Sequence, residues 1–303
     1  MTVDIEALAQ QVEQHPDYRV LRRLAPGRVF HTPTPGQAVS RGVVLDTETT
    51  GLDLHSDRVI ELGMLAFEFD PVTGTVFRVV EVFDELEDPG FSIPAASVAV
   101  HHITDEMVKG KHIDDARVHQ FLKNVDVVIA HNAAFDRPFV EARWPIFEEL
   151  NWACSIKDID WREEGFGSAK LEYLLTTQGF FYEAHRAETD CWALLELLNF
   201  VLPQSQQTAL LSLLLTLNQP QQKVYALNSP FETKDSLKAR GYRWSAELRC
   251  WSRVVSGEQE REQELQWLKR QVYGERNARV QVETLGGKVR YSIREGHKEM
   301  VTI

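Results

Sequence analysis

The sequence predicts a mixed α/β fold, in which helices flank a central mixed sheet and a small α+β module follows at the C-terminus. Three observations support this prediction. Strand patterns joined by a hairpin turn come first, helical and strand patterns then alternate, and the charge balance changes sign towards the C-terminus. The chain has 303 residues, of which 43% are hydrophobic, enough for one large core or two unequal ones.

Residues 1–40 form a predicted N-terminal extension, with helical spacing to about residue 30 and a proline-rich break after it. Residues 41–202 carry the main α/β pattern. Strands are expected at 43–45, 58–69, 75–83 and 126–130, with a hairpin turn at 71–74. Helices are expected at 114–122, from 135 to 143, at 170–177 and at 189–201.

Residues 203–220 are predicted to be a helical linker, with a short apolar helix at 209–217, and residues 221–303 a separate module. Residues 221–303 hold 16 Lys and Arg against 11 Asp and Glu, a balance of +5, whereas the other 220 residues balance at −17. An acidic body can bind divalent cations while a basic module grips a polyanion. A chance asymmetry in an acidic protein is the alternative.

No apolar run reaches the roughly 18 residues of a membrane-spanning helix, and the first residues show no secretory pattern. Three widely spaced cysteines form no metal-binding or paired pattern, so we expect reduced thiols in a cytoplasmic protein without a membrane partner.

An apolar strand runs directly into Asp46, and Glu48 follows two positions later. Residues two apart on a strand point to the same face, so these carboxylates repel each other unless a cation lies between them. Mg²⁺ prefers such oxygen ligands. A solvated strand end has the same pattern, but the following residues 49–52 add a glycine where a backbone can approach a substrate closely.

Two further motifs place an acid near the start of a helix. Asp136 ends the segment 131–136, His-Asn-Ala-Ala-Phe-Asp, where this acid or Asn132 could equally be a helix cap. Asp190 lies in the first turn of an amphipathic helix, and His185 precedes it by five residues in a loop. Histidine often serves as a proton acceptor in active sites, although a lone loop histidine usually has no function.

Together, the motifs Asp46-Thr-Glu48-Thr-Thr-Gly-Leu, His131 to Asp136 and His185-x-x-x-x-Asp190 resemble the three motifs of the DEDDh, or DnaQ-like, exonuclease family. The histidine separates this group from one that carries tyrosine. The resemblance covers about residues 41–202 and implies a ribonuclease H-like fold. The family includes proofreading subunits of bacterial replicative DNA polymerase III and free-standing homologues.

The resemblance implies a 3′-5′ exonuclease that hydrolyses DNA to nucleoside 5′-monophosphates. Asp46, Glu48, Asp136 and Asp190 would hold two divalent ions, Mg²⁺ or Mn²⁺, since both suit carboxylate sites. His185 would act as the general base towards the attacking water. The expected partners are DNA 3′ ends, most simply single-stranded ones, and a polymerase or repair protein.

Substrate contacts also follow from the resemblance. Backbone groups at Thr47 and Thr49, together with Leu52 and Asn132, would hold the terminal nucleotide. Leu52 would wedge against a base, although a place in the core explains it equally well.

The segment Val100-His101-His102-Ile103-Thr104 resembles a His-Gly-Ile-Thr segment of the family, which lies beside the substrate terminus. His101 and Thr104 are therefore candidate substrate contacts. His102 replaces the glycine, which leaves the shape of this loop in doubt.

The C-terminal residues are similar to a small strand-helix-hairpin module appended to DNA-processing enzymes. A strand at 224–231, a helix at 234–241 and two aromatic strands at 242–244 and 249–253 are expected, followed by a solvated helix at 258–270. Candidate nucleic-acid contacts are Lys238, Arg240, Arg243 and Arg253. Trp244 and Trp251 can stack on bases, but filling a small core is the simpler interpretation. Deleting the module is expected to leave an active exonuclease that binds long DNA more weakly.

Two other functions remain open. An RNA 3′-5′ exonuclease would use the same chemistry, and no residue pattern here reads a 2′-hydroxyl. A non-catalytic subunit bound to a polymerase is the second, but such a subunit has no need of four carboxylates and a histidine in family spacing.

Overall fold

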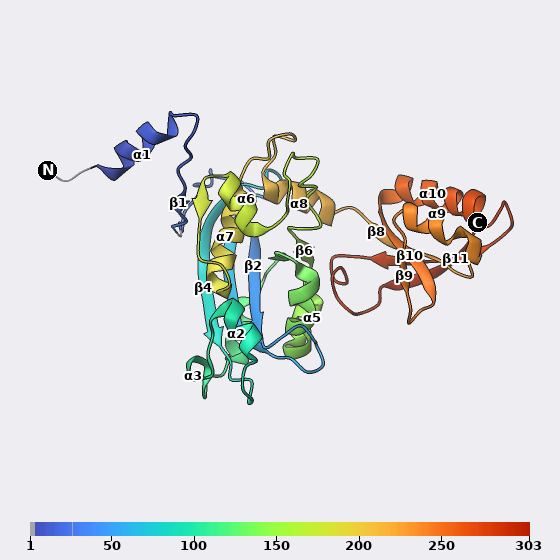
Figure 1. Ribbon diagram of the computed structural model, residues 1–303, viewed down its shortest axis with the longest axis horizontal. Coiled ribbons are helices and arrows are strands. Elements are labelled where there is room, and N and C mark those ends of the chain that lie inside the picture. The colour runs from blue at the N-terminus through green and yellow to red at the C-terminus, as the bar shows by residue number, and fades with distance from the viewer. Residues whose placement is uncertain (1–3, 26) are drawn as a thin grey trace.

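The structure, a computed structural model, describes residues 4–25 and 27–303 (Figure 1). Its central sheet consists of β2 (Ser40–Thr49), β3 (Val59–Phe69), β4 (Val76–Leu86), β5 (Val127–Ala130) and β6 (Trp152–Cys154). The strand order is β4–β3–β2–β5–β6. β3 is antiparallel to β2 and β4, while β5 is parallel to β2 and β6. The predicted mixed sheet is confirmed.

Helices cover both faces of this sheet, because side chains alternate along its buried strands. Val44 and Leu65 contribute to the core beneath α6 (Leu171–Thr177) and α7 (Ala187–Asn199). Val43 and Leu45 contribute to the core on the opposite face, under α4 (Asp115–Phe121) and α5 (Ala133–Arg143), which is followed by the short helix η1 (Pro145–Glu149). The resulting helix–sheet–helix layers are those of a ribonuclease H-like fold.

The main α/β unit extends beyond its predicted end at residue 202. The helix expected at 209–217 is present as α8 (Ala209–Leu217), but it is not a free linker. Ala209, Leu210 and Leu213 are buried in the same core as α7. A run this rich in leucine has too much apolar surface to remain in solvent.

The N-terminal extension departs further from the prediction. Only α1 (Ile5–Glu13) is helical, and none of its residues is buried. The chain then forms β1 (Arg22–Arg23), which pairs with β7 (Phe180–Phe181). The expected helix to residue 30 is therefore wrong, since pairing of β1 with β7 of the main α/β unit replaces it. Residues 1–3 and 26 of this extension lie outside the described residues.

Several segments were not expected from the sequence, among them α2 (Ala95–His101), α3 (Asp105–Val108) and β6. They are short, and α2 and α3 connect β4 to α4 on the flank of the sheet (Figure 1). Cys154, Cys191 and Cys250 are buried free thiols. Within the described residues, no helix is both long and apolar enough to cross a membrane.

Residues 221–303, termed here the C-terminal module, form a second, fully antiparallel sheet with the order β12–β11–β8–β10–β9. Its strands are β8 (Gln221–Ala226), β9 (Arg243–Ser245), β10 (Cys250–Ser256), β11 (Arg279–Leu285) and β12 (His297–Thr302). Its helices are η2 (Phe231–Thr233), α9 (Lys234–Ala239), α10 (Gly257–Trp267) and the π-helical turn η3 (Leu268–Val272). The module has its own small apolar core.

The expected solvated helix near 258–270 is only partly solvated. Glu264 on α10 is fully buried and accepts hydrogen bonds from Arg240, Arg253 and Tyr242. The charged sequence pattern therefore did not reveal that Glu264 is a buried hydrogen-bond acceptor inside the module.

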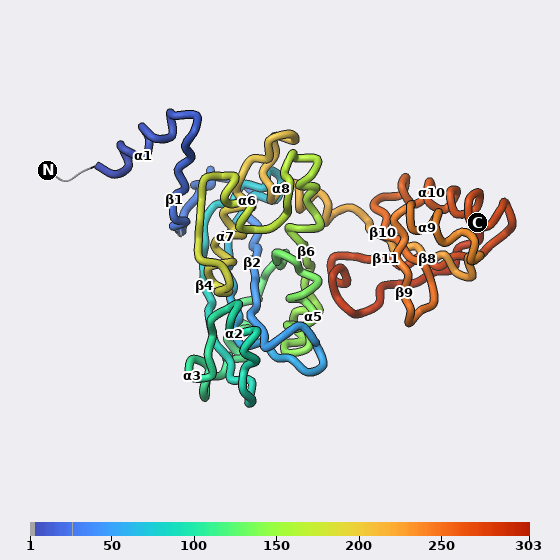
Figure 2. Tube along the Cα trace, in the orientation of Figure 1, coloured from blue at the N-terminus to red at the C-terminus, as the bar shows by residue number. Residues whose placement is uncertain are grey.

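The loop between β11 and β12 leaves the module and reaches back to the main α/β unit beside α5 (Figure 2). We call residues 286–294 of this loop the docking arm. Gly287 accepts a hydrogen bond from the Trp152 backbone N–H at 2.9 Å, and Tyr291 donates one to the buried Asp158 at 2.6 Å. The two units are thus joined at α5 and β6, as well as through the covalent chain.

Candidate active site

Two of the predicted acids lie at the end of β2. This strand continues past its apolar residues because Asp46 and Glu48 remain in register with Gly63 and Glu61 of β3. The pairing keeps both carboxylates on one face, as the sequence predicts. A β-bulge follows directly after Glu48, where the strand turns away from the sheet.

Asp136 approaches the same point from the first turn of α5 and is buried. Its Oδ1 accepts hydrogen bonds from the Thr47 backbone N–H at 3.1 Å and from the Thr47 hydroxyl at 2.8 Å. Thr47 therefore fixes Asp136 relative to β2. The candidate substrate role of Thr47 is limited accordingly, since its N–H and hydroxyl already donate inside the protein.

Asp190 enters from the first turn of α7, and the loop before that helix is folded around it. The backbone N–H groups of His185 and Arg186 donate to Asp190 Oδ2 at 2.8 and 3.1 Å. The Tyr182 hydroxyl donates to Oδ1 at 3.1 Å. His185 itself has φ of 69°, a left-handed conformation that is uncommon for a side-chain-bearing residue. The loop thus places the histidine next to the acid.

The acids of β2 and α7 come together closely. One carboxylate oxygen from each of Asp46, Glu48 and Asp190 lies within 4.8 Å of the other two. Asp136 lies outside this set of three, although its charge is the strongest charge acting on Asp46. Three of the four predicted ligands therefore meet directly, and the fourth borders them.

These carboxylates resist ionisation. Burial, and then the charge of Asp136, raises the pKa of Asp46 well above its ordinary value. Burial and the charge of Asp190 raise the pKa of Glu48 to about 8, and burial raises that of Asp136 to about 7 and that of Asp190 in the same direction. A divalent cation would relieve this repulsion, so the oxygen donors present fit a hard metal ion.

These shifts predict how the stability of the metal-free protein depends on pH. A carboxyl group whose pKa is raised on folding stabilises the fold below its unfolded pKa and loses that effect as pH rises through its folded value. In EDTA, the melting temperature should therefore fall between about pH 4 and the folded pKa of about 8 at Glu48. Stabilisation by Mg²⁺ or Mn²⁺ should grow over the same range.

The measurement is thermal unfolding at several pH values, with EDTA or metal, for the wild type and Glu48→Gln. The variant cannot ionise at residue 48, so its melting temperature in EDTA should fall less steeply with pH than that of the wild type. Equal slopes for the two proteins would contradict the assigned repulsion.

A second layer of residues, which the sequence analysis passed over, holds this loop in place. Glu61 on β3 is fully buried and accepts two hydrogen bonds from the Arg186 guanidinium, at 2.9 and 2.6 Å. It also accepts one from the Ala187 backbone N–H at the start of α7, at 2.9 Å. A charged residue inside the apolar run Val-Ile-Glu-Leu was the available signal, because buried charges need partners.

Gly63 explains how α7 comes so close to the sheet. A Cβ at this position would lie 2.4 Å from the carbonyl carbon of Ala187. The glycine therefore lets the start of α7, and with it Asp190, pack directly on β3 opposite Asp46.

An open hollow of about 540 Å³ lies over the acids and is lined by Asp46, Asp190, His185 and Asn132, among others. We call it the active-site hollow. Asn132 is exposed, has φ of 89°, and makes no capping hydrogen bond to α5. Its amide is therefore available to a ligand. His131 also lines the hollow, but burial lowers its pKa to about 4, so it is neutral near pH 7.

The remaining substrate candidates separate clearly by exposure. Leu52 is 85% exposed, so its interpretation as a core residue is wrong. Thr49 is buried, and its hydroxyl donates to the Gly51 carbonyl at 2.6 Å. The Leu52 side chain is thus open to solvent, whereas the Thr49 hydroxyl is already engaged within the loop.

The loop around His101 is shaped internally. His101 is buried, its Nδ1 accepts from the Ile103 N–H at 3.0 Å, and burial lowers its pKa. His102 has φ of 60°, a left-handed conformation that favours glycine, the residue that the family resemblance implies at this position. The backbone keeps that shape despite the histidine. Thr104 directly precedes α3, and its hydroxyl donates to Glu106 at 3.4 Å.

The four cations proposed for the module differ in availability. Arg240 and Arg253 are paired with Glu264, and Arg253 also with Glu260. Arg243 and Lys238 are exposed, on β9 and α9 respectively. Two of the four predicted contacts therefore form ion pairs within the module, although Arg240 remains exposed.

Comparison with known proteins agrees with this arrangement. The family model RNase_T, described as "Exonuclease", matches residues 43–198. The chain is 30% identical over 161 residues to DNA polymerase III subunit epsilon of Treponema pallidum, covering 50% of this chain and 72% of that protein. It is 34% identical over 101 residues to a PolC-type DNA polymerase III of Lacticaseibacillus paracasei, which spans 33% of this chain but only 6% of the polymerase.

Among solved structures, the fold is similar to that of E. coli Exonuclease I in complex with a dA16 oligonucleotide. The TM-score is 0.50 at 16% identity, over 76% of this chain and 71% of that one. Residues 43–198, which the family model matches, include all four acids and the histidine, on the elements that the three motifs predict. The chain therefore belongs to the RNase_T family of exonucleases, the DnaQ-like family that its motifs resemble.

Proposed function

We propose that this protein is a metal-dependent 3′-5′ exonuclease that releases nucleoside 5′-monophosphates from single-stranded DNA. The observation that carries the proposal is the convergence of Asp46, Glu48 and Asp190 within 4.8 Å, beside a loop histidine. Similarity to a subunit of a DNA polymerase supports DNA as the substrate.

The metal ligands would be Asp46, Glu48 and Asp190, with Asp136 completing the set. When bound, divalent ions supply Lewis-acid chemistry, since they offset negative charge on the scissile phosphate and the leaving 3′ oxygen. Thr47 keeps Asp136 oriented towards β2. The hydrogen bonds from residues 182, 185 and 186 keep Asp190 oriented towards the same point.

His185 would accept the proton of the attacking water on a ring nitrogen. The water oxygen forms a new bond to phosphorus and the bond from phosphorus to the 3′ oxygen breaks. The leaving oxygen takes up a proton from solvent, so the DNA ends in a new 3′ hydroxyl. Asn132, which lines the hollow, and the exposed Leu52 would position the terminal nucleotide. The ion pair of Arg186 with Glu61 fixes the backbone next to His185, the proposed general base.

A direct test uses a 5′-end-labelled oligonucleotide, as DNA and as RNA, with Mg²⁺ or Mn²⁺. Successive one-nucleotide shortening of the labelled DNA is expected, with release of 5′-monophosphates. Loss of the label as a mononucleotide would indicate the opposite direction. Preference for RNA would overturn the substrate assignment, and absence of hydrolysis on both polymers would favour a non-catalytic subunit.

Replacing His185 by Ala should lower turnover by about 10²- to 10⁴-fold, because the attacking water loses its proton acceptor. Binding of Mn²⁺, followed by electron paramagnetic resonance, should remain close to wild type, since the His185 backbone N–H still donates to Asp190. His119→Ala, an exposed position on α4, is the matched control. An unchanged pH–rate profile in His185→Ala would exclude the proposed role.

A further inference from the structure

Three hollows follow one another from the acids to the C-terminal module. The active-site hollow shares Ile156, Ser168 and Ala169 with a neighbour of about 710 Å³, which we call the seam hollow. The seam hollow is also lined by Gln221 and Ser256 of the module, so it bridges the two units. It is a continuation of the active site towards the second sheet.

Lys157 connects the seam hollow to the module. This residue follows β6 and also lines a third hollow of about 620 Å³, the module hollow, whose other basic residues are Lys223, Arg243 and Arg253. Adjacent residues of one segment, Ile156 and Lys157, therefore border the acids on one side and the module on the other.

The module hollow is positively charged although the protein as a whole carries −12. Four cations and no carboxylate line it. Arg253 is paired with Glu260 and Glu264, but within the described chain Lys157, Lys223 and Arg243 have no carboxylate within ion-pair distance. Three cations left without acidic partners beside an acidic body indicate a polyanionic ligand.

The carboxylates that line the seam hollow would repel a polyanion only weakly. Asp158 is buried, accepts from the Cys154 N–H at 2.8 Å, and also accepts from the Tyr291 hydroxyl of the docking arm. Asp160 is the exposed acid among the residues lining this hollow. The route from the acids to the module therefore changes from acidic to basic along its length.

An aromatic side chain completes the module hollow. Trp244 is 51% exposed, although its place in a tiny core was the simpler interpretation of the sequence. Its ring packs edge-on against Trp251, with the centroids 5.6 Å apart, so the exposed ring has a fixed orientation. An exposed, supported indole next to cations suits stacking on an unpaired base.

We propose that the seam and module hollows form a track for the single strand that precedes the terminal nucleotide. Lys157, Lys223 and Arg243 contact its phosphates, and Trp244 stacks on one of its bases. The proposal rests on the proposed function for the direction of the strand, but the track itself is a binding site that exists without turnover. The docking arm keeps the two halves of the track in register.

The test compares Lys157→Glu, Arg243→Glu and Trp244→Ala with the control Lys123→Glu, which makes the same charge change at an exposed site after α4, away from the hollows described here. The probes are a deoxythymidine trinucleotide and an oligodeoxythymidine of about 20 nucleotides, longer than the site size of a typical single-strand-binding module. Affinity is measured with Ca²⁺ over a range of salt, and turnover with Mg²⁺.

Trp244→Ala should weaken binding of the long strand about 5- to 100-fold, the usual loss for one stacked base. Each charge reversal should weaken it more than Lys123→Glu does and reduce the salt slope by about 0.7 for each phosphate that the variant no longer neutralises. Turnover of the trinucleotide should equal that of the wild type in all variants. Track variants that match Lys123→Glu on the long strand would overturn the proposal. If the wild type hydrolysed neither probe while the binding losses persisted, the proposed function would fail and the track would stand.

Discussion

Replacing Asp46 by Asn is expected to abolish hydrolysis and, at the same time, to raise the melting temperature of the metal-free protein. Asp46 lies where charges from Asp136, Asp190 and Glu48 converge, and burial adds to their effect on its pKa. An amide keeps the shape and removes one charge from this cluster, so the metal-free fold gains stability. Turnover should fall by at least about 10³-fold, because the residue would supply a ligand to ions that stabilise the transition state.

The same outcome is expected for Glu48→Gln, Asp136→Asn and Asp190→Asn, and double variants should lose little more than single ones because the ligands act as a unit. Asp190→Asn carries an additional cost, since the N–H groups of residues 185 and 186 lose a charged acceptor. Calorimetric unfolding in EDTA and turnover with saturating Mg²⁺ measure both effects. Asp53→Asn, at an exposed loop position, is the control. A variant of the four acids with near wild-type turnover would remove that residue from the ligand set.

How far the sequence predicts this site depends on which contacts are local. Asp46, Glu48 and the five-residue spacing from His185 to Asp190 are local features, and the structure places them together. The contact of Glu61 with Arg186 spans 125 positions. The apolar run around Glu61 signals that this charge needs a partner, but nothing in the sequence identifies Arg186 as that partner. Pairing between distant buried charges is decided by packing, which periodicity does not describe.

The fold shows the same division. The strand boundaries of β3 and the helix of residues 209–217 follow from apolar periodicity, and both are present. The helix was assigned to a linker, whereas it packs in the main core. Periodicity reveals an apolar surface but not what covers it. The exposed Leu52 and Trp244 are the converse case, in which apolar residues remain outside the cores. Both lie at places where we propose that DNA supplies the missing contact.

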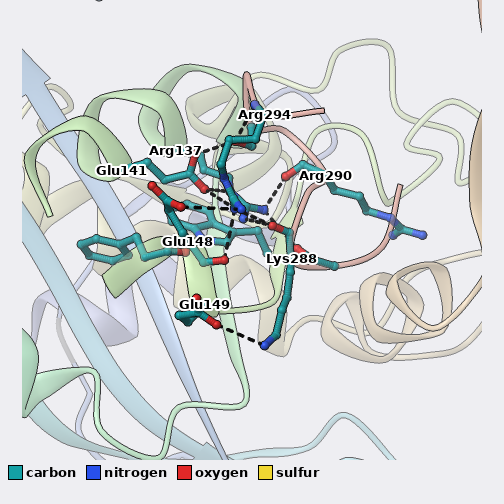
Figure 3. Close-up of polar contacts among 11 residues, drawn as sticks. Arg137, Glu141, Glu148, Glu149, Lys288, Arg290 and Arg294 are labelled. Atoms are coloured by element: carbon teal, nitrogen blue, oxygen red, sulfur yellow. Dashed lines mark hydrogen bonds and ion pairs between the residues drawn. The ribbon is translucent and has the colours of Figure 1, made fainter. Parts of the chain in front are cut away.

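The attachment of the C-terminal module changes what its removal should do. Arg137, the residue after Asp136, is fully buried and donates to the backbone carbonyls of Gly287, Lys288 and Arg290 at 3.0, 2.5 and 2.6 Å (Figure 3). It also pairs with Glu141 at 2.6 Å. The sequence suggested a separable tail, whereas the structure has a buried guanidinium of the catalytic helix that depends on the docking arm for three of its acceptors.

Glu141 is held from both sides of this junction. Burial alone would raise its pKa, but hydrogen bonds from Arg294, Ser292 and Arg137 keep it below its ordinary value. Arg290 extends the contact in the other direction and donates to the carbonyls of Thr216 and Gln219, at the end of α8 and just beyond it. The arm thus connects α5 and α8, and its loss would leave several buried polar groups without partners.

Arg137→Ala should therefore destabilise the full chain by about 3–5 kcal/mol, the usual result of removing one member of a buried ion pair. For a protein of this size the melting temperature should fall by roughly 10 °C. Deleting residues 221–303 should have an effect of similar size, because it removes the acceptors instead of the donor. Arg78→Ala, which breaks a surface pair with Glu68, should change stability by no more than about 1 kcal/mol and is the control.

The measurement is calorimetric unfolding of the full chain, the two variants and residues 1–220, combined with turnover of a trinucleotide well below each melting temperature. If the arm couples the units, the full chain unfolds in one transition and Arg137→Ala in two, because the module no longer shares the stability of the catalytic unit. Every folded form should still hydrolyse the trinucleotide, since the docking arm contacts the outer side of α5 and none of the four proposed metal ligands. A fragment of residues 1–220 that unfolds at the same temperature as the full chain would show that the arm contributes no stability and that the module is a separable tail after all.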